Sequence, residues 1–214
     1  MHEIVDFFLH LDKHLDEIIQ AKGTLTYGIL FAIIFCETGL VITPFLPGDS
    51  LLFAAGAFSA RPNPVLQAGF LYFLLTAAAL LGDHSNYWIG RFFGPKVFGR
   101  FVNKRHIDRT HEFYEKHGVL TLVFAQFVPI IRTFAPFVAG VGDMTYGKFA
   151  RFNFIGVMIW TTLFIWAGYF FGNLDFVKEH FHYVVLAIIA ISVLPIAMEV
   201  VKTYLGGKKT KRRK

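Results

Sequence analysis

The sequence has few charged residues and almost no cysteine. Only 17% of its 214 residues are charged, and Cys36 is the single cysteine. One cysteine cannot form an intrachain disulfide, which excludes a disulfide-stabilised scaffold. No polar linker divides the chain, so we expect a single domain.

Signatures of common catalytic sites are also missing. The chain has no Walker loop, no nucleophile elbow and no paired-histidine metalloprotease motif. His106, His111 and His117 lie in a basic segment without the spacing of a zinc site. No histidine in apolar sequence has the set of nearby arginines that an integral-membrane lipid phosphatase needs. We therefore expect no enzymatic activity, no metal and no cofactor.

Apolar residues are abundant instead. They make up 55% of the chain, and 26 residues are phenylalanine. Long apolar runs with few charges are typical of polytopic membrane proteins. The net charge of +6 would suggest a nucleic-acid partner for a soluble protein, but here the basic residues cluster in two segments beside predicted membrane helices. We therefore expect membrane lipids around this chain and no nucleic acid.

The pattern predicts an all-α polytopic membrane protein with one membrane domain over residues 1–205. We expect two inverted units, each a re-entrant helical hairpin followed by a transmembrane helix. The predicted segments are an N-terminal amphipathic helix (1–23), a first hairpin (24–60), a transmembrane helix (66–93), a basic linker (94–118), a second hairpin (119–142), a transmembrane helix (147–172), an extra C-terminal transmembrane helix (182–203) and a basic disordered tail (206–214). The amphipathic helix suits the membrane interface and packing on protein equally well.

Both predicted hairpins are interrupted by proline and carry charge at the break. Glu37 precedes the first break and Asp49 follows it, whereas Arg132 lies between Pro129 and Pro136 in the second. Broken helices persist in lipid only where protein or a water-filled cavity surrounds them. Paired interruptions in the two halves of a membrane chain indicate a transport site near the midplane.

The lysines and arginines predict the orientation. Sixteen lie in the linker, the adjoining helix end and the tail, and four lie on the other side. Because these residues accumulate on the cytoplasmic side, we expect the linker and the C-terminus in the cytoplasm. The same count places the N-terminus outside, unless residues 24–43 cross the membrane completely.

Each intramembrane charge has a structural and a functional interpretation, since an ionised side chain in the bilayer is costly. Glu37 either forms a hydrogen bond to the opposite hairpin or takes up a proton for coupling. Asp49 either caps a helix or accepts a proton as well. Arg132 either pairs with an acid or binds phosphate through its planar guanidinium. Asp83 either caps or packs a helix or supports the site.

Four segments resemble the DedA family of bacterial inner-membrane proteins, which carry a VTT domain. They read FCETGLVITPFLPGDSLLFAAGA, GDHSNYWIGRFFG, FYEKHG and FVPIIRTFAPFVAGVGDMTYGKF, and the resemblance extends roughly from Val5 to Pro195. It implies two re-entrant hairpins that face each other. It also implies recycling of the lipid carrier undecaprenyl phosphate, proton-dependent transport and resistance to cationic compounds. Eukaryotic members of the family are lipid scramblases.

The family's functional residues can be placed on this sequence. Its two acids fall on Glu37 and Asp49, which the resemblance makes proton-coupling residues, and one of its two arginines falls on Arg132. The other arginine position holds Gln126, so this chain has three intramembrane acids, with Asp83, and one base. Either some of these acids are protonated or the site accepts a cation.

Three hypotheses follow. The first is a proton-coupled transporter in which Arg132 and Gln126 bind the lipid phosphate, with Asp83 in support. The second is a proton-coupled exporter of small cations or drugs, which three acids suit better. The third is a lipid scramblase or a non-transporting protein of membrane integrity. A homo-oligomer is compatible with all three.

Overall fold

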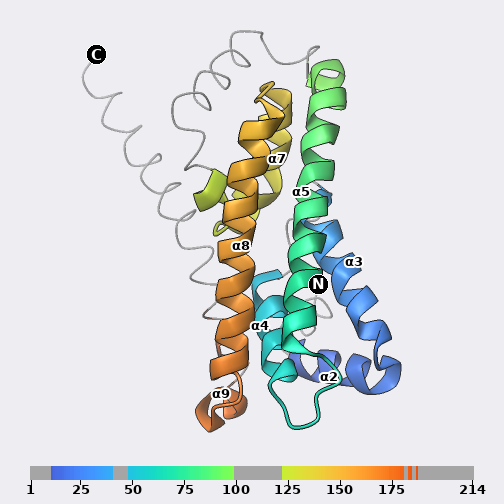
Figure 1. The fold of residues 1–214 in the computed structure, drawn as a ribbon, viewed down its shortest axis with the longest axis vertical. Helices are drawn as coiled ribbons and strands as arrows, with labels where there is room; N and C mark the ends of the chain where they lie inside the picture. The colour runs from blue at the N-terminus through green and yellow to red at the C-terminus, as the bar shows by residue number, and fades with distance from the viewer. Residues whose placement is uncertain (1–10, 41–47, 99–121, 181–182, 185–186, 188–214) are drawn as a thin grey trace, which may run out of the picture.

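The computed structural model of the chain describes residues 11–40, 48–98, 122–180, 183–184 and 187. These residues form helices and no strand, which confirms the all-α prediction for them (Figure 1). The helices are α2 (Leu11–Lys22), α3 (Leu25–Gly39), α4 (Gly48–Ser59), α5 (Ala68–Phe98), α7 (Pro129–Val141), α8 (Tyr146–Phe171) and α9 (Asp175–Glu179).

Several predicted features lie outside the described residues, at least in part. They are the first ten residues of the amphipathic helix, the break in the first hairpin at 41–47, most of the basic linker, nearly all of the transmembrane helix 182–203 and the tail 206–214. Helix α5 extends to Phe98, past the predicted end of its transmembrane helix at residue 93.

Helix length separates the spanning helices from the shorter ones. Among the described residues, α8 is the one helix that is both long and apolar enough to cross a membrane. Helix α5 has 31 residues, or roughly 46 Å at 1.5 Å per residue, but its second half is polar. Helices α3 and α7 have 15 and 13 residues, and each is shorter than the roughly 30 Å of a hydrocarbon core.

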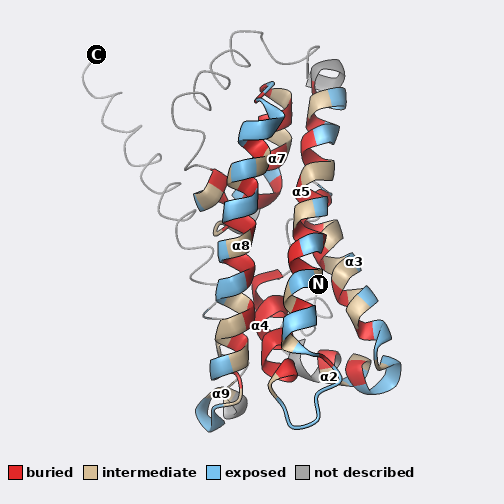
Figure 2. Cartoon of the chain, in the orientation of Figure 1, coloured by how far each residue is buried: buried red, intermediate tan, exposed pale blue. Residues whose placement is uncertain are grey.

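Helices α5 and α8 are antiparallel neighbours at the centre of the bundle. The hydroxyl oxygens of Thr76 and Thr161 are 3.0 Å apart, and further along α5 the His84 ring packs edge-on against Phe149. Residue numbers therefore rise along α5 while those of the contacting residues on α8 fall. Apolar side chains on the outer faces of both helices are exposed, as lipid contact requires (Figure 2); examples are Phe70, Phe73, Phe154, Leu163 and Phe170.

Glycines bring α7 onto α5 at close range. A methyl group on Gly90 would meet the carbonyl oxygen of Phe137, and one on Gly140 would meet that of Tyr87. Further along, Gly94 faces Val141, so the contacts advance in the same direction on both helices. Helices α5 and α7 are therefore parallel, and they approach as small-residue membrane interfaces do.

Helix α4 packs on α8 by the same arrangement. Gly56 faces the carbonyl oxygen of Ile165, and Gly168 faces that of Phe53, so each glycine again meets the carbonyl three residues before its partner glycine. Every residue of α4 is buried (Figure 2). Each short helix after a proline break thus packs on the long helix of the other half of the chain.

The close crossing of α5 and α7 predicts an effect of a single methyl group. We expect Gly140→Ala to lower the free energy of unfolding by about 1–3 kcal/mol, since the new Cβ meets backbone that cannot rotate away. Gly28→Ala in α3 is the control, because nothing lies within 4 Å of its added methyl. Thermal unfolding of the purified protein in detergent measures both; equal stability of Gly140→Ala and the parent would contradict this contact.

Candidate functional site

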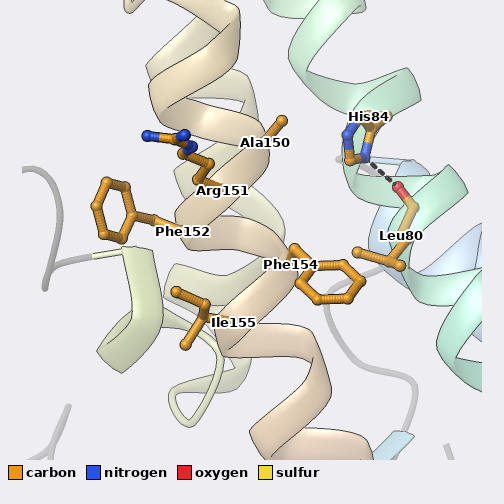
Figure 3. A pocket seen from close by; sticks show the side chains of 7 residues that line it. All are labelled: Leu80, His84, Ala150, Arg151, Phe152, Phe154 and Ile155. Carbon is orange, nitrogen blue, oxygen red and sulfur yellow. Dashed lines mark hydrogen bonds between the residues drawn. The ribbon is translucent and has the colours of Figure 1, made fainter.

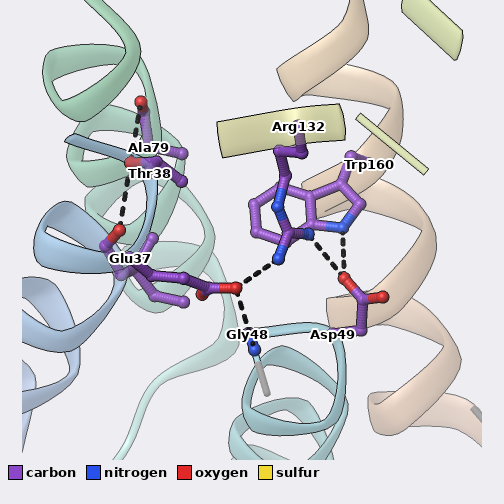
Figure 4. A network of polar contacts seen from close by, with 8 residues as sticks. Glu37, Thr38, Gly48, Asp49, Ala79, Arg132 and Trp160 are labelled. Atoms are coloured by element: carbon purple, nitrogen blue, oxygen red, sulfur yellow. Dashed lines mark hydrogen bonds and ion pairs between the residues drawn. The ribbon is translucent and has the colours of Figure 1, made fainter. Parts of the chain in front are cut away.

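Arg132, in the first turn of α7, lies between the two acids of the first hairpin (Figure 4). Its Nη1 donates to Asp49 Oδ1 at 2.6 Å, and its Nη2 forms an ion pair with Glu37 Oε1. The three side chains are 1–7% exposed. The expected contact of Arg132 with Glu37 or Asp49 is therefore present, and it involves both acids.

Trp160 of α8 completes this cluster and is not among the site residues predicted from the sequence. Its indole Nε1 donates to Asp49 Oδ1 at 2.8 Å, and the Arg132 guanidinium carbon lies 4.4 Å from the centre of its ring. The backbone N–H of Gly48 donates to Glu37 Oε1 at 3.3 Å. A tryptophan within an apolar span needs an acceptor for its N–H, which is the signal that could have identified it.

Two of the three charges lie at helix ends that disfavour them. Glu37 is in the last turn of α3, near the negative end of the helix dipole, and Arg132 is in the first turn of α7, near the positive end. Only Asp49, in the first turn of α4, lies at an end that stabilises its charge. The cluster is therefore held by mutual attraction rather than by the helices.

Two polar atoms of this cluster are not engaged. Glu37 Oε2 and Arg132 Nε are buried and have no hydrogen-bond partner among the described residues. Burying an unpaired donor or acceptor costs about 1–3 kcal/mol. The cluster therefore retains one donor and one acceptor that a ligand can use.

Asp83 and Gln126 meet in a second buried cluster. Gln126 Nε2 donates to Asp83 Oδ2 at 2.9 Å and to Asn153 Oδ1 of α8 at 3.0 Å. Asp83 lies in the middle of α5, so the helix-capping interpretation is wrong and the packing interpretation fits. The amide N–H groups of Gln126 are thus directed to an acid and to an amide oxygen; its predicted role in phosphate binding stays a prediction.

Asn86 joins the backbone beside both members of the Glu37–Arg132 pair. Its Nδ2 donates to the carbonyl oxygens of Thr38, at 3.1 Å, and of Thr133, at 2.6 Å. These residues directly follow Glu37 and Arg132. Asn86 is fully buried, so this bridge fixes how far α3 and α7 can separate.

An open groove of about 680 Å³ runs along the outside of α5 and α8 (Figure 3). Leu80 and His84 of α5 and Phe154 and Ile155 of α8 are among its wall residues. His84 Nδ1 lies 2.6 Å from the carbonyl oxygen of Leu80, and since a carbonyl can only accept, Nδ1 is the donor. Asp83 and Asn153 of the second cluster are adjacent in sequence to wall residues of this groove but do not line it.

Comparison with known proteins identifies the family. A VTT domain matches residues 46–170. The chain is 48% identical over 203 residues to Protein DedA of Escherichia coli K12, covering 93% of each chain. The chain belongs to the DedA family. It is also 42% identical over 181 residues to the uncharacterized membrane protein Rv0364 of Mycobacterium tuberculosis, covering 83% of this chain and 79% of that one.

The inner membrane protein YghB of Escherichia coli K12 is 32% identical to this DedA-family chain over 202 residues, which cover 90% of this chain and 84% of the relative. No solved structure matches the chain. These relatives identify a membrane protein, as the composition predicted, and their names assign no catalytic activity.

The Trp160 contact predicts a loss of stability. We expect Trp160→Phe to lower the free energy of unfolding by about 1.5–3 kcal/mol, because Asp49 loses a donor while an aromatic ring remains over Arg132. Trp88→Phe is the matched control, since Trp88 is 38% exposed on α5. Thermal unfolding compares the two; a Trp160→Phe protein as stable as Trp88→Phe would exclude this hydrogen bond as a stabilising contact.

Proposed function

We propose that this protein transports a polyprenyl phosphate lipid carrier, undecaprenyl phosphate, across the bacterial inner membrane with coupling to protons. The observation that supports this most is the buried Arg132, held by Glu37 and Asp49 with its Nε unpaired. A guanidinium cannot lose its charge and grips phosphate in a bidentate way. An arginine whose partners are carboxylates can exchange them for a phosphate of the same sign.

Proton binding drives the exchange of carboxylate for phosphate at Arg132 in this mechanism. Protonation of Glu37 or Asp49 removes one negative charge and weakens its pairing with Arg132. The phosphate oxygens then accept hydrogen bonds from the freed guanidinium, and Gln126 is the second donor. Release of the proton on the other side restores the carboxylate, which displaces the phosphate. Glu37 and Asp49 are the proton-coupling residues and Asp83 supports the site; no cofactor besides the proton gradient is required.

The directions of the helices support an inverted architecture. Helices α3, α5 and α7 run one way through the bundle, and α4 and α8 run the other way (Figure 1). The glycine contacts by which α4 packs on α8 match those by which α7 packs on α5. We infer two inverted units whose re-entrant hairpins meet at the ion cluster. The protein is then multi-pass with a cytoplasmic C-terminus, and a homo-oligomer fits this arrangement.

The groove outside α5 and α8 suits the lipid tail. Its wall is mainly apolar and it is open to the surroundings, so a polyprenyl chain can remain in the bilayer while the headgroup enters the protein. Arg151, at its rim, provides a cation for an approaching phosphate (Figure 3).

A flipping assay tests the proposal. The full chain is reconstituted in vesicles with labelled undecaprenyl phosphate, with and without a pH gradient, beside Arg132→Ala and the exposed control Lys148→Ala. We expect gradient-stimulated flipping by the parent and by Lys148→Ala, and none by Arg132→Ala. Flipping that ignores the gradient indicates a scramblase, and no flipping by the parent overturns the proposal.

The excess of acid favours a second candidate, a proton-coupled exporter of small cations. Among the described residues, Glu37, Asp49 and Asp83 are the buried acids and Arg132 is the buried arginine. A cation substrate would balance this charge directly. Uptake of a lipophilic cation into the same vesicles, in competition with undecaprenyl phosphate, separates the two functions.

A further inference from the structure

We infer that Asp83, Asn86 and Gln126 form a binding site for a small monovalent cation of the sodium class, separate from the Arg132 cluster. The three side chains come from α5 and from the segment that precedes α7. They are at most 2% exposed. This inference concerns an ion that binds whether or not a lipid is present, although Asp83 and Gln126 also belong to the proposed phosphate site.

The side chains share one side of α5. Asp83 and Asn86 are three residues apart, which places them on the same helix face. Gln126 contacts this face directly, because its Nε2 donates to Asp83 Oδ2 at 2.9 Å. Asn153 of α8 closes the cluster by accepting from the same Nε2 at 3.0 Å.

The cluster has a surplus of oxygen acceptors. Asp83 Oδ1, Asn86 Oδ1 and Gln126 Oε1 are all buried, and none has a hydrogen-bond donor among the described residues. Among the described residues, the donor left unpaired beside them is Asn153 Nδ2, which lies close enough to Asp83 to interact with it. One amide NH2 group has two N–H donors and cannot satisfy three oxygens, and buried acceptors are rarely left without a partner. A cation, with any water it retains, supplies the positive partner that these oxygens lack.

The chemistry of the oxygens selects the kind of cation. Carboxylate and carbonyl oxygens suit hard cations, and midplane sites in transporters bind sodium through oxygen ligands, there backbone carbonyls. The cluster holds one carboxylate, so a single positive charge neutralises it, whereas a divalent ion would leave an excess.

Arg132 does not provide a contacting positive charge for Asp83. Its Nη1 and Nη2 are engaged by Asp49 and Glu37. Arg132 attracts Asp83 only at a distance, and a buried carboxylate without a counter-ion in contact is costly. A monovalent cation beside Asp83 therefore lowers the net charge of the buried groups without disturbing the arginine cluster.

Direct ion binding tests this inference. Radioactive sodium binding and thermal unfolding are measured on the purified full chain in detergent, in sodium chloride against choline chloride at equal ionic strength. We expect saturable sodium binding and a melting temperature that rises with sodium. At a sodium concentration of about 100 times Kd, the folding equilibrium shifts by roughly a hundredfold.

Two variants place the ion at Asp83. Asp83→Asn should abolish both sodium effects, whereas Asp143→Asn should retain them, because the Asp143 side chain is 71% exposed and pairs with Arg91 at the surface. Sodium binding that persists in Asp83→Asn, or a parent protein without sodium-specific binding, overturns the site. The latter result would mean that water alone occupies it.

Gln126→Arg keeps the inference testable if Asp83→Asn does not fold. A guanidinium at this position lies beside Asp83 and replaces the ion with a fixed charge. We expect this variant to unfold at a higher temperature than the parent in choline chloride and to lose its response to sodium. A Gln126→Arg protein that binds sodium as the parent does would overturn the inference.

Discussion

Arg132→Ala is expected to abolish lipid transport and to destabilise the protein. The change leaves Glu37 and Asp49 buried without their counter-charge, and breaking a buried pair in this way costs about 3–5 kcal/mol. Trp160 also loses the cation over its ring. Thermal unfolding and the flipping assay measure the two effects separately.

Arg132→Lys distinguishes phosphate binding from simple charge pairing. Lysine retains the positive charge but has no planar fork, so it cannot hold a phosphate by two parallel hydrogen bonds. We therefore expect transport close to that of Arg132→Ala, with much of the stability recovered. A lysine variant that transports like the parent would show that the charge alone matters.

A neutral triple variant serves as the matched control. In Arg132→Leu, Glu37→Gln, Asp49→Asn, all three charges are removed together, and replacing a complete buried ion cluster is often neutral or stabilising. We expect this protein to be at least as stable as the parent but unable to transport. Inactivity of Arg132→Ala then cannot be ascribed to misfolding alone.

The contact of Arg132 with Glu37 and Asp49 could be predicted from the sequence. Single charges in apolar sequence are costly, so charges of opposite sign in two broken helices are expected to pair. This expectation does not depend on how the helices are arranged. The sequence therefore indicates which residues meet, but not the geometry with which they meet.

The partners of these residues could not be predicted in the same way. Trp160, Asn86 and Asn153 carry no charge, and their contacts depend on which helix lies opposite. That α4 packs on α8 and α7 on α5 follows from glycines whose role is visible only when a second helix approaches. The contact of Gln126 with Asp83 also depends on this packing, and the predicted role of Gln126 in phosphate binding stays a prediction.

Asn86 links the position of the helices to the state of the ion pair. Its amide bridges the carbonyls that follow Glu37 and Arg132, so movement of α3 relative to α7 changes both this bridge and the pair. Because Glu37 and Arg132 lie at unfavourable helix ends, weakening their attraction favours separation. A proton or a phosphate that disrupts the pair can therefore shift the balance between two helix arrangements.

Glu37→Gln is expected to abolish gradient-driven transport without destabilising the protein. Glutamine retains an oxygen that accepts from Arg132 and from the Gly48 N–H, but it cannot take up a proton at the pH of the assay. It also removes one of two carboxylates that face a single guanidinium, so the buried cluster becomes neutral. We therefore expect the melting temperature to stay the same or to rise. A gain in stability with a loss of activity is typical of residues kept for function.

Vesicles with and without a pH gradient measure this effect, and Glu17→Gln on the exposed face of α2 is the matched control. In Glu37→Gln, flipping with the gradient should fall to the level seen without it, while Glu17→Gln should respond to the gradient as the parent does. If Glu37→Gln keeps the full response, the proton is carried elsewhere, and Asp49 becomes the group to test. If it instead unfolds at a much lower temperature, the carboxylate is needed to balance Arg132, and its role is structural rather than one of coupling.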